Sequence, residues 1–200
     1  MQVDFAQTQE LLDKVREAYS NAADSPGDAH PFPMGYDFAL SLGYPEDLLK
    51  RLPESSIRRF TGVSNVSIFA EIPAGSTILD LGCGSGTDSL IAGEKTGSEG
   101  RVYGVDFSRS MLTYARAGAS EPAAANVEFR KSDGQHIPFA DGTFDVALVN
   151  GIFNLNPTRA GLFQELARVI RPGGVLYGAG IVLREPMDQE ERAGLSNWFS

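Results

Sequence analysis

Cysteine and histidine are scarce in this chain of 200 residues. The single cysteine, Cys83, excludes an internal disulfide and any metal site made of cysteines alone. The two histidines, His30 and His136, are too few and too far apart in the sequence for a metal-binding motif. The sequence therefore predicts no bound metal.

Basic runs and long apolar runs are also missing. The formal net charge is −9 and no basic helix is present, so we expect neither a nucleic acid nor a membrane as partner. No apolar run approaches the roughly 20 residues needed to span a bilayer. The stretch from Met1 to Glu10 is polar and unlike a signal peptide. The expected location is the cytoplasm.

What is present is the composition of a globular domain, with 42% hydrophobic and 22% charged residues. From Gly75 onward, predicted strands alternate with predicted helices. Strands are expected at 77–81, 102–105, 127–130, 144–149 and 174–179, and helices at 87–96, 108–118 and 158–170, the last with Asn156 as its N-cap and Pro157 at its first position. This alternation predicts an α/β fold with a doubly wound, mostly parallel sheet.

The residues before Gly75 read as helical but less regular. An amphipathic helix is expected from Phe5 to Ala22, with shorter helices at 45–50 and around 66–70. The stretch from His30 to Tyr36 is irregular but apolar. We therefore expect residues 1–74 to form an N-terminal helical segment and residues 75–200 the ligand-binding α/β domain, in one compact unit.

The stretch from Ile78 to Thr87 organises the chain. An apolar run opens into glycines at alternate positions, Gly82, Gly84 and Gly86, and a predicted helix follows at once. Glycines allow a tight turn and let a ligand approach the backbone, while the N–H groups that start a helix favour an anion. This predicts a nucleotide-type ligand. A dinucleotide-binding oxidoreductase would carry Gly or Ala in place of Thr87, which disfavours a nicotinamide cofactor.

Asp106 ends the second predicted strand, about 20 residues past the turn, where an acid is suited to accept hydrogen bonds from a ribose. The alternative is that Asp106 only favours the start of the next helix, which Ser108 could also cap. The glycine turn favours the ribose interpretation.

Polar residues follow the third and fourth predicted strands as well. Asp133 could accept from an adenine amino group, or form an ordinary Asp-Gly turn with Gly134. Asn150, Gly151 and Asn154 follow the fourth strand, where side chains face the crevice at the edge of the sheet. They could equally be ordinary loop residues.

These residues resemble the motifs of class I S-adenosylmethionine-dependent methyltransferases. Residues 78–86 resemble the first motif, 105–106 the ribose motif, 132–133 the adenine-side motif, and 144–147 and 169–174 the later motifs. The resemblance implies a Rossmann-like fold, S-adenosylmethionine as cofactor and S-adenosylhomocysteine as product. The cofactor-binding residues that it implies are Tyr19, Asp80, Gly82, Cys83, Gly84, Gly86, Asp106, Phe107, Met111, Ser132, Asp133, Gly134, Asn150, Gly151 and Asn154, although Met111 also suits the core of a helix.

A narrower resemblance is to arsenite methyltransferases, through residues 15–19, 150–157 and 181–183. It implies that Tyr19 helps to close over the cofactor. That family binds trivalent arsenic through cysteine thiolates, and the corresponding positions here are Gly151 and, roughly, the segment from Phe60 to Asn65, which contain no cysteine. Because a soft metalloid needs sulfur ligands, we expect a relative of these enzymes without arsenic binding.

The resemblance also implies a lid. Residues 19–36 are expected to close over the site, with Phe32, Met34 and Tyr36 near the acceptor, unless these side chains only pack against the sheet. The family's sheet usually has two further strands after the fifth, which this chain is expected to lack. The exposed edge could pair in a homodimer.

We expect methyl transfer to a small-molecule acceptor. No nucleophile–base pair is readable, so the catalytic residues are unknown; a general base is needed only if the acceptor is protonated. The alternative is a non-catalytic S-adenosylmethionine-binding sensor or partner subunit. An arsenite methyltransferase or a nicotinamide-dependent oxidoreductase is less expected.

Overall fold

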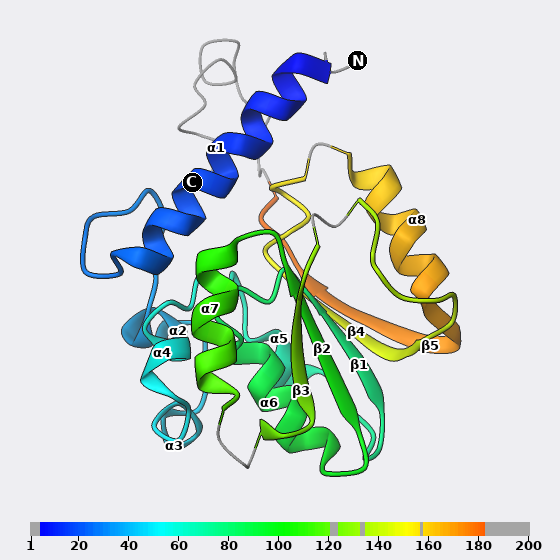
Figure 1. Ribbon diagram of the computed structural model, residues 1–200. Coiled ribbons are helices and arrows are strands. Elements are labelled where there is room, and N and C mark those ends of the chain that lie inside the picture. The colour runs from blue at the N-terminus through cyan, green and yellow to red at the C-terminus, as the bar shows by residue number, and fades with distance from the viewer. Residues whose placement is uncertain (1–4, 121–123, 133–134, 157, 183–200) are drawn as a thin grey trace.

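The computed structural model describes residues 5–120, 124–132, 135–156 and 158–182. Five parallel strands form one sheet in the order β3-β2-β1-β4-β5 (Figure 1). The strands are β1 Thr77–Leu81, β2 Arg101–Asp106, β3 Val127–Lys131, β4 Phe144–Asn150 and β5 Ile170–Ala179. The predicted Rossmann-like α/β sheet is thereby confirmed.

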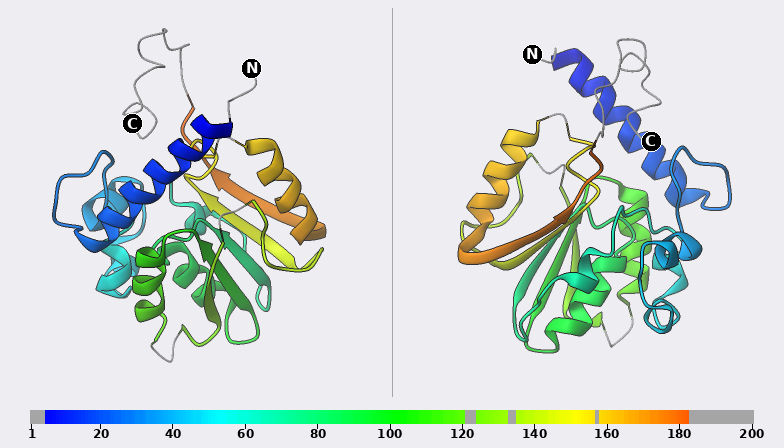
Figure 2. Two further views of the ribbon diagram at one scale, coloured as in Figure 1. Left: turned by 45° about the horizontal axis from the view of Figure 1, so that its top comes forward. Right: turned by 180° about the vertical axis from the view of Figure 1, so that it is seen from behind.

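Helices cover both faces of this sheet (Figure 2). They are α1 Phe5–Asp24, α2 Tyr36–Ser41, α3 Glu46–Leu49, α4 Glu54–Ile57, α5 Val66–Phe69, α6 Thr87–Thr96, α7 Arg109–Gly118 and α8 Arg159–Val169. α6 and α7 lie on one face and α8 on the other, which is the doubly wound arrangement.

The central strand β1 shows why the apolar run before the glycines is continuous. Successive side chains of a strand point to opposite faces, so Leu79 packs with Leu162 and Leu166 of α8, while Ile78 packs with Ala92 of α6. Ile78 and Leu79 are fully buried, and burial of such a side chain stabilises a fold by about 1.5–3 kcal/mol. β1 therefore fixes the position of the turn that follows it.

Several predicted boundaries were wrong. Helix α8 begins at Arg159 with Thr158 as its N-cap; the side chain of Asn156 instead accepts hydrogen bonds from Thr158 N and Oγ1, both at 2.8 Å. Pro157 lies outside the described residues. Strand β5 begins at Ile170 rather than Gly174, because Ile170 already pairs with Phe144 before an irregularity in the register. Helices α2 and α4 were not predicted from the sequence.

Within the described part of the chain, no helix is both long and apolar enough to cross a bilayer. The chain beyond residue 182, where further strands would follow, lies outside the described residues.

Candidate functional site

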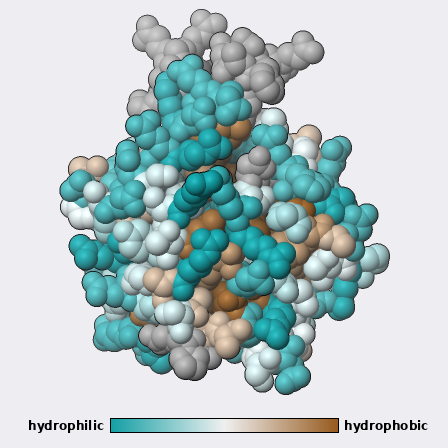
Figure 3. Space-filling model, in the orientation of Figure 1, coloured by the Kyte–Doolittle hydropathy of each residue, from teal (hydrophilic) through white to brown (hydrophobic). Residues whose placement is uncertain are grey.

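Two cavities meet at the carboxyl ends of β1, β2 and β4, and both are lined by Gly82. The first, which we call the α1 cavity, has a volume of about 140 Å³ and lies between α1 and the edge of the sheet; its lining includes Leu12, Val15, Arg16, Gly82, Asp106, Phe107, Ser132, Gln135, Ile152 and Leu155. The second, the turn cavity, is lined by residues that include Arg59, Gly62, Asp80, Gly84, Thr87, Asp88 and Asn150. In the space-filling view, hydrophobic residues show between hydrophilic ones in the area below α1 (Figure 3).

Asp106 is placed as both sequence interpretations require. Its side chain is 7% exposed, lines the α1 cavity and accepts backbone N–H bonds from Gly84 (2.9 Å) and Ser108 (2.8 Å). The Ser108 hydroxyl caps α7 by accepting from Met111 N at 3.3 Å. Burial raises the pKa of Asp106 to about 6, against the lowering effect of these N–H groups. The carboxylate therefore binds the backbone of the glycine turn and also forms part of the wall of the α1 cavity.

Tyr19 of α1 lies beside this acid. Its ring stacks on Phe32 with centroids 4.6 Å apart and meets the edge of Phe107 at 6.4 Å. Burial, followed by the negative charge of Asp106, raises the pKa of Tyr19 above its usual value, so the hydroxyl stays protonated. Tyr36, by contrast, packs in a cluster with Ala39 and other residues of the N-terminal segment, and not against the sheet as the packing alternative expected.

The glycines of the turn differ in their surroundings. A Cβ on Gly82 would lie 2.1 Å from Ile152 Cδ1, whereas one on Gly84 would have no heavy atom within 4 Å. Gly86 is the N-cap of α6 with φ +88°, and a Cβ there would lie 2.6 Å from Phe129 Cζ. Gly84 thus faces open space in the turn cavity, while Gly86 is required by packing.

This difference predicts that an alanine at Gly86 acts mainly on stability, whereas an alanine at Gly84 acts mainly on ligand binding. Gly86→Ala should lower the free energy of unfolding by about 2–4 kcal/mol, because left-handed strain and overpacking add. Gly84→Ala should cost only about 1–2 kcal/mol, from its φ of +53°, but its methyl group would enter the turn cavity and weaken ligand binding. Urea unfolding and ligand titration of both variants measure the two effects. Equal losses of stability would contradict the assignment.

The turn cavity contains two polar groups that matter for a ligand. Asp80 is 2% exposed and accepts from Ser89 Oγ at 2.5 Å; burial and then the charge of Asp88 raise its pKa to about 8. Thr87, also 2% exposed, has a buried hydroxyl with no hydrogen-bond partner among the residues that the structure describes. Thr87 was not among the ligand-binding residues predicted from the sequence, although a hydroxyl at the start of a helix that follows a glycine turn indicates such a role.

Asn150 lines the turn cavity, but its amide already binds the N-terminal segment. Its Oδ1 accepts from Val63 N (2.8 Å) and Ser64 N (3.1 Å), and its Nδ2 donates to Ser64 O (2.7 Å) and Asp88 Oδ2 (2.9 Å). Gly151 is buried next to Val63, since a Cβ on it would lie 3.2 Å from Val63 Cγ1. Asn150 therefore fixes residues 63 and 64 against the end of β4.

The remaining predicted residues vary in accessibility. Cys83 and Met111 are buried at 8% and 1% exposure, and burial raises the pKa of the Cys83 thiol. Asn154 has a buried Oδ1 for which the described part of the chain provides no hydrogen-bond donor. Ser132 lines the α1 cavity, while Asp133 and Gly134 lie outside the described residues. No group of three or more His, Cys, Asp or Glu side chains among the described residues is arranged to hold a metal ion.

The doubly wound sheet and the glycine turn with its two cavities define a nucleotide-cofactor-binding α/β protein. The chain belongs to the methyltransferase domain family, whose profile matches residues 72–198. The predicted resemblance to class I S-adenosylmethionine-dependent methyltransferases is thus confirmed.

Similar proteins agree with this family. The chain is 36% identical over 129 residues to an arsenite methyltransferase of Halobacterium salinarum (64% of this chain, 33% of the relative). It is 38% identical over 100 residues to a demethylmenaquinone methyltransferase of Lactococcus lactis (50% and 40%). A crystal structure of an arsenic(III) S-adenosylmethionine methyltransferase from Chlamydomonas reinhardtii matches with a TM-score of 0.62 and 26% identity, over 78% of this chain and 52% of that one. The chain thus spans well under half the length of these two curated relatives.

The structure brings Gly151 close to the segment from Phe60 to Asn65. These are the positions that correspond, by the resemblance described above, to the arsenic-binding cysteines of arsenite methyltransferases. Val63 and Gly151 are neighbours, as described above, but neither carries sulfur. Cys83, the chain's single cysteine, lies in the glycine turn with a raised thiol pKa. A metalloid site made of two thiolates would need a second cysteine, and this sequence contains one.

Proposed function

We propose that this chain binds S-adenosylmethionine across the α1 cavity and the turn cavity and transfers its methyl group to a small-molecule acceptor, with S-adenosylhomocysteine as product. The observation that carries the proposal is the meeting of the two cavities at Gly82. One cavity offers an acid for a ribose. The other offers an acid, open backbone and an unpartnered hydroxyl for the polar end of an amino acid.

The residues that line the two cavities fit the chemistry of the cofactor. Asp106 would hold the ribose hydroxyls, with Phe107 and Ser132 at the adenine end of the α1 cavity. In the turn cavity, Asp80 would attract the ammonium group and Gly84 and Thr87 would bind the carboxylate. The roles of the other predicted residues stay predictions. The bound cofactor would supply an activated methyl group, so the protein's task is to align the acceptor and exclude water.

We propose that residues 1–74 act as the lid and acceptor segment. Leu12, Val15 and Arg16 of α1 close one side of the α1 cavity, and residues 59–62 close one side of the turn cavity. The acceptor is a small molecule other than arsenite, because the paired sulfur ligands are missing. A cytoplasmic location, the absence of a nucleic-acid partner and a homodimer through the β5 edge remain predictions.

The competing hypothesis, a sensor or partner subunit without catalysis, makes the same binding prediction and differs in turnover. Titration of wild-type chain with S-adenosylmethionine tests binding, and methyl transfer to a panel of small acceptors tests the enzyme. Micromolar binding with product formation supports the proposal. Binding without turnover on any acceptor favours the sensor, and no binding contradicts both.

The raised pKa of Asp80 gives the binding a pH dependence. A carboxyl group with a pKa of about 8 is mainly neutral at pH 6. A cationic ligand binds its ionised form, so at pH 6 binding must first release the proton of Asp80. The affinity should therefore increase as the pH rises from 6 to 8, by up to about tenfold per pH unit. By the same linkage, ionisation of Asp80 destabilises the ligand-free fold as pH rises through about 8. Titrations at several pH values measure the slope.

Asp80→Asn is the matched control, because an amide oxygen can still accept from Ser89 but does not titrate. The Asp80→Asn variant should bind S-adenosylmethionine more weakly, and its affinity should lose the part of the pH dependence that comes from Asp80. A slope that is unchanged in Asp80→Asn would rule out Asp80 as its source.

A further inference from the structure

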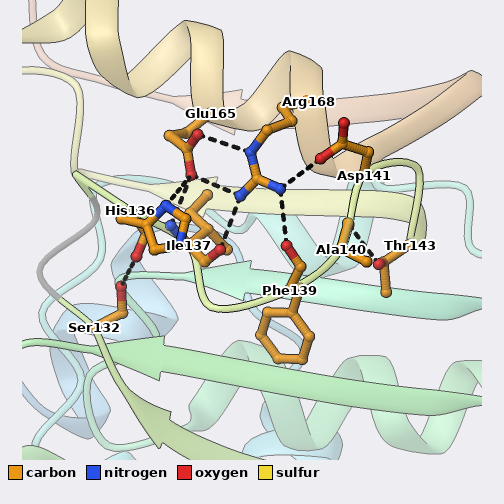
Figure 4. A network of polar contacts seen from close by, with 9 residues as sticks. All are labelled: Ser132, His136, Ile137, Phe139, Ala140, Asp141, Thr143, Glu165 and Arg168. Carbon is orange, nitrogen blue, oxygen red and sulfur yellow. Dashed lines mark hydrogen bonds and ion pairs between the residues drawn. The ribbon is translucent and has the colours of Figure 1, made fainter.

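A half-buried ion pair on α8, Glu165 with Arg168, holds the loop that follows β3 (Figure 4). Glu165 and Arg168 are one turn apart, and Arg168 donates to both oxygens of Glu165, from Nε and Nη2, each at 2.8 Å. Their side chains are 17% and 25% exposed. The hydrogen bond from Arg168 is the main cause that lowers the pKa of Glu165 to about 2, so both groups stay charged at neutral pH.

The two side chains of the pair bind both an N–H group and carbonyl groups of the loop's main chain. Glu165 Oε2 accepts from Ile137 N at 2.8 Å, while Arg168 donates to Ile137 O at 2.9 Å and to Phe139 O at 2.8 Å. Arg168 also donates to Asp141 Oδ1 at 2.8 Å. A guanidinium has five donors in a rigid plane, so one side chain fixes two carbonyls at a set separation. Few other side chains could do this.

The held segment leads directly to the α1 cavity. Ser132 and Gln135 line that cavity, and Ser132 Oγ donates to His136 O at 3.0 Å, one residue before Ile137. Ile137 itself is fully buried against Leu162 and Leu166 of α8. The position of the cavity wall is therefore set by α8, on the face of the sheet opposite to α6 and α7.

We infer that Glu165 and Arg168 are positioning residues for the adenosine part of the cofactor. Neither residue lines the α1 cavity, so their effect passes through the backbone of residues 136–139 and the hydrogen bond from Ser132 to His136 O. The inference rests on the proposed function, because it assigns the α1 cavity to adenosine. It adds a residue pair that acts on affinity without touching the ligand.

The test compares three arginine variants. Arg168→Met keeps the aliphatic stem and removes every donor; Arg168→Lys keeps the charge without the planar group. Arg171→Met is the control, because Arg171 forms an ion pair with Asp145 at 2.5 Å and makes no such contact with the loop. Calorimetric titration with S-adenosylhomocysteine and with adenosine gives the affinities, and urea unfolding at the same temperature gives the stabilities.

We expect Arg168→Met to weaken both ligands by the same factor, tenfold or more, and Arg168→Lys by an intermediate factor. Arg171→Met should bind both ligands within twofold of wild type. If Arg168→Met does not fold, Arg168→Lys decides, since a purely structural role would lower its stability and leave affinity unchanged. Wild-type affinity in a folded Arg168 variant overturns the inference alone. No binding by the wild type overturns the proposed function and the inference with it.

Discussion

Replacement of Asp88 by alanine is expected to lower the free energy of unfolding by about 3–5 kcal/mol. Asp88 is 6% exposed and accepts from Tyr44 Oη (2.6 Å), Asn150 Nδ2 (2.9 Å) and Ser67 Oγ. Alanine would remove one acceptor from each of these three buried donors. Tyr44 and Asn150 would keep their bonds to Ser64 O, whereas Ser67 Oγ would lose its acceptor. A buried group left unsatisfied costs about 1–3 kcal/mol. Because these donors come from the N-terminal segment and from β4, the substitution would weaken the contact between that segment and the sheet, which Asn150 would still hold through Val63 and Ser64.

Two matched variants sharpen this result. Asp88→Asn keeps one acceptor oxygen and should lose less stability than alanine. Glu94→Ala removes an acid further along the same helix, whose ion pair with Arg51 is 3.1 Å long and whose side chain is 59% exposed. Such a surface pair contributes at most about 1 kcal/mol. Urea unfolding measures all three. An Asp88→Ala variant as stable as Glu94→Ala would show that the buried network does not hold the fold.

The second large effect is expected on ligand binding, from Asp106→Asn. We expect S-adenosylhomocysteine to bind ten- to a hundredfold more weakly, a change of about 1.4–2.8 kcal/mol. An asparagine has one acceptor oxygen in place of two charged ones, so it cannot serve Gly84 N, Ser108 N and a ribose together. Calorimetric titration gives the affinity, and circular dichroism checks the fold.

Ser108→Ala separates the two interpretations of Asp106. This substitution removes the N-cap of α7 and should cost about 0.5–2 kcal/mol of stability, while leaving the affinity for S-adenosylhomocysteine within twofold. If Asp106→Asn behaved in the same way, losing stability and keeping affinity, then Asp106 would serve the helix start alone. The ribose assignment would then have to be abandoned.

The sequence predicted the α/β half of the fold well because its signals are local. β1 and α6 have the bounds that their apolar pattern and glycines predict. Helices α2 and α4, of six and four residues, are too short to show a helical period. The class of ligand followed from the turn and from Asp106, since both lie within one βαβ unit.

The parts of the site that could not be predicted depend on contacts between distant residues. Asn150 binds Val63, 87 positions earlier, and Arg168 binds Phe139, 29 positions earlier. Nothing in the local sequence of either pair indicates the other member. Asn150 was expected to face a ligand because it follows a strand. It lines the turn cavity, and its amide also binds the neighbouring segment, which the local sequence did not indicate.

The position of α1 has a consequence for the speed of ligand exchange. Its polar contacts with Ser108 and Ser110 come from Ser20 (3.1 Å) and Asp24 (3.0 Å), near its end, whereas the residues that close the α1 cavity lie earlier in the helix. We therefore predict that the part of α1 up to Arg16 moves away from the sheet when a ligand enters or leaves the α1 cavity. Such a gate slows association and dissociation by similar factors. The residence time of the ligand would therefore depend on the movement of α1, while its equilibrium dissociation constant would not.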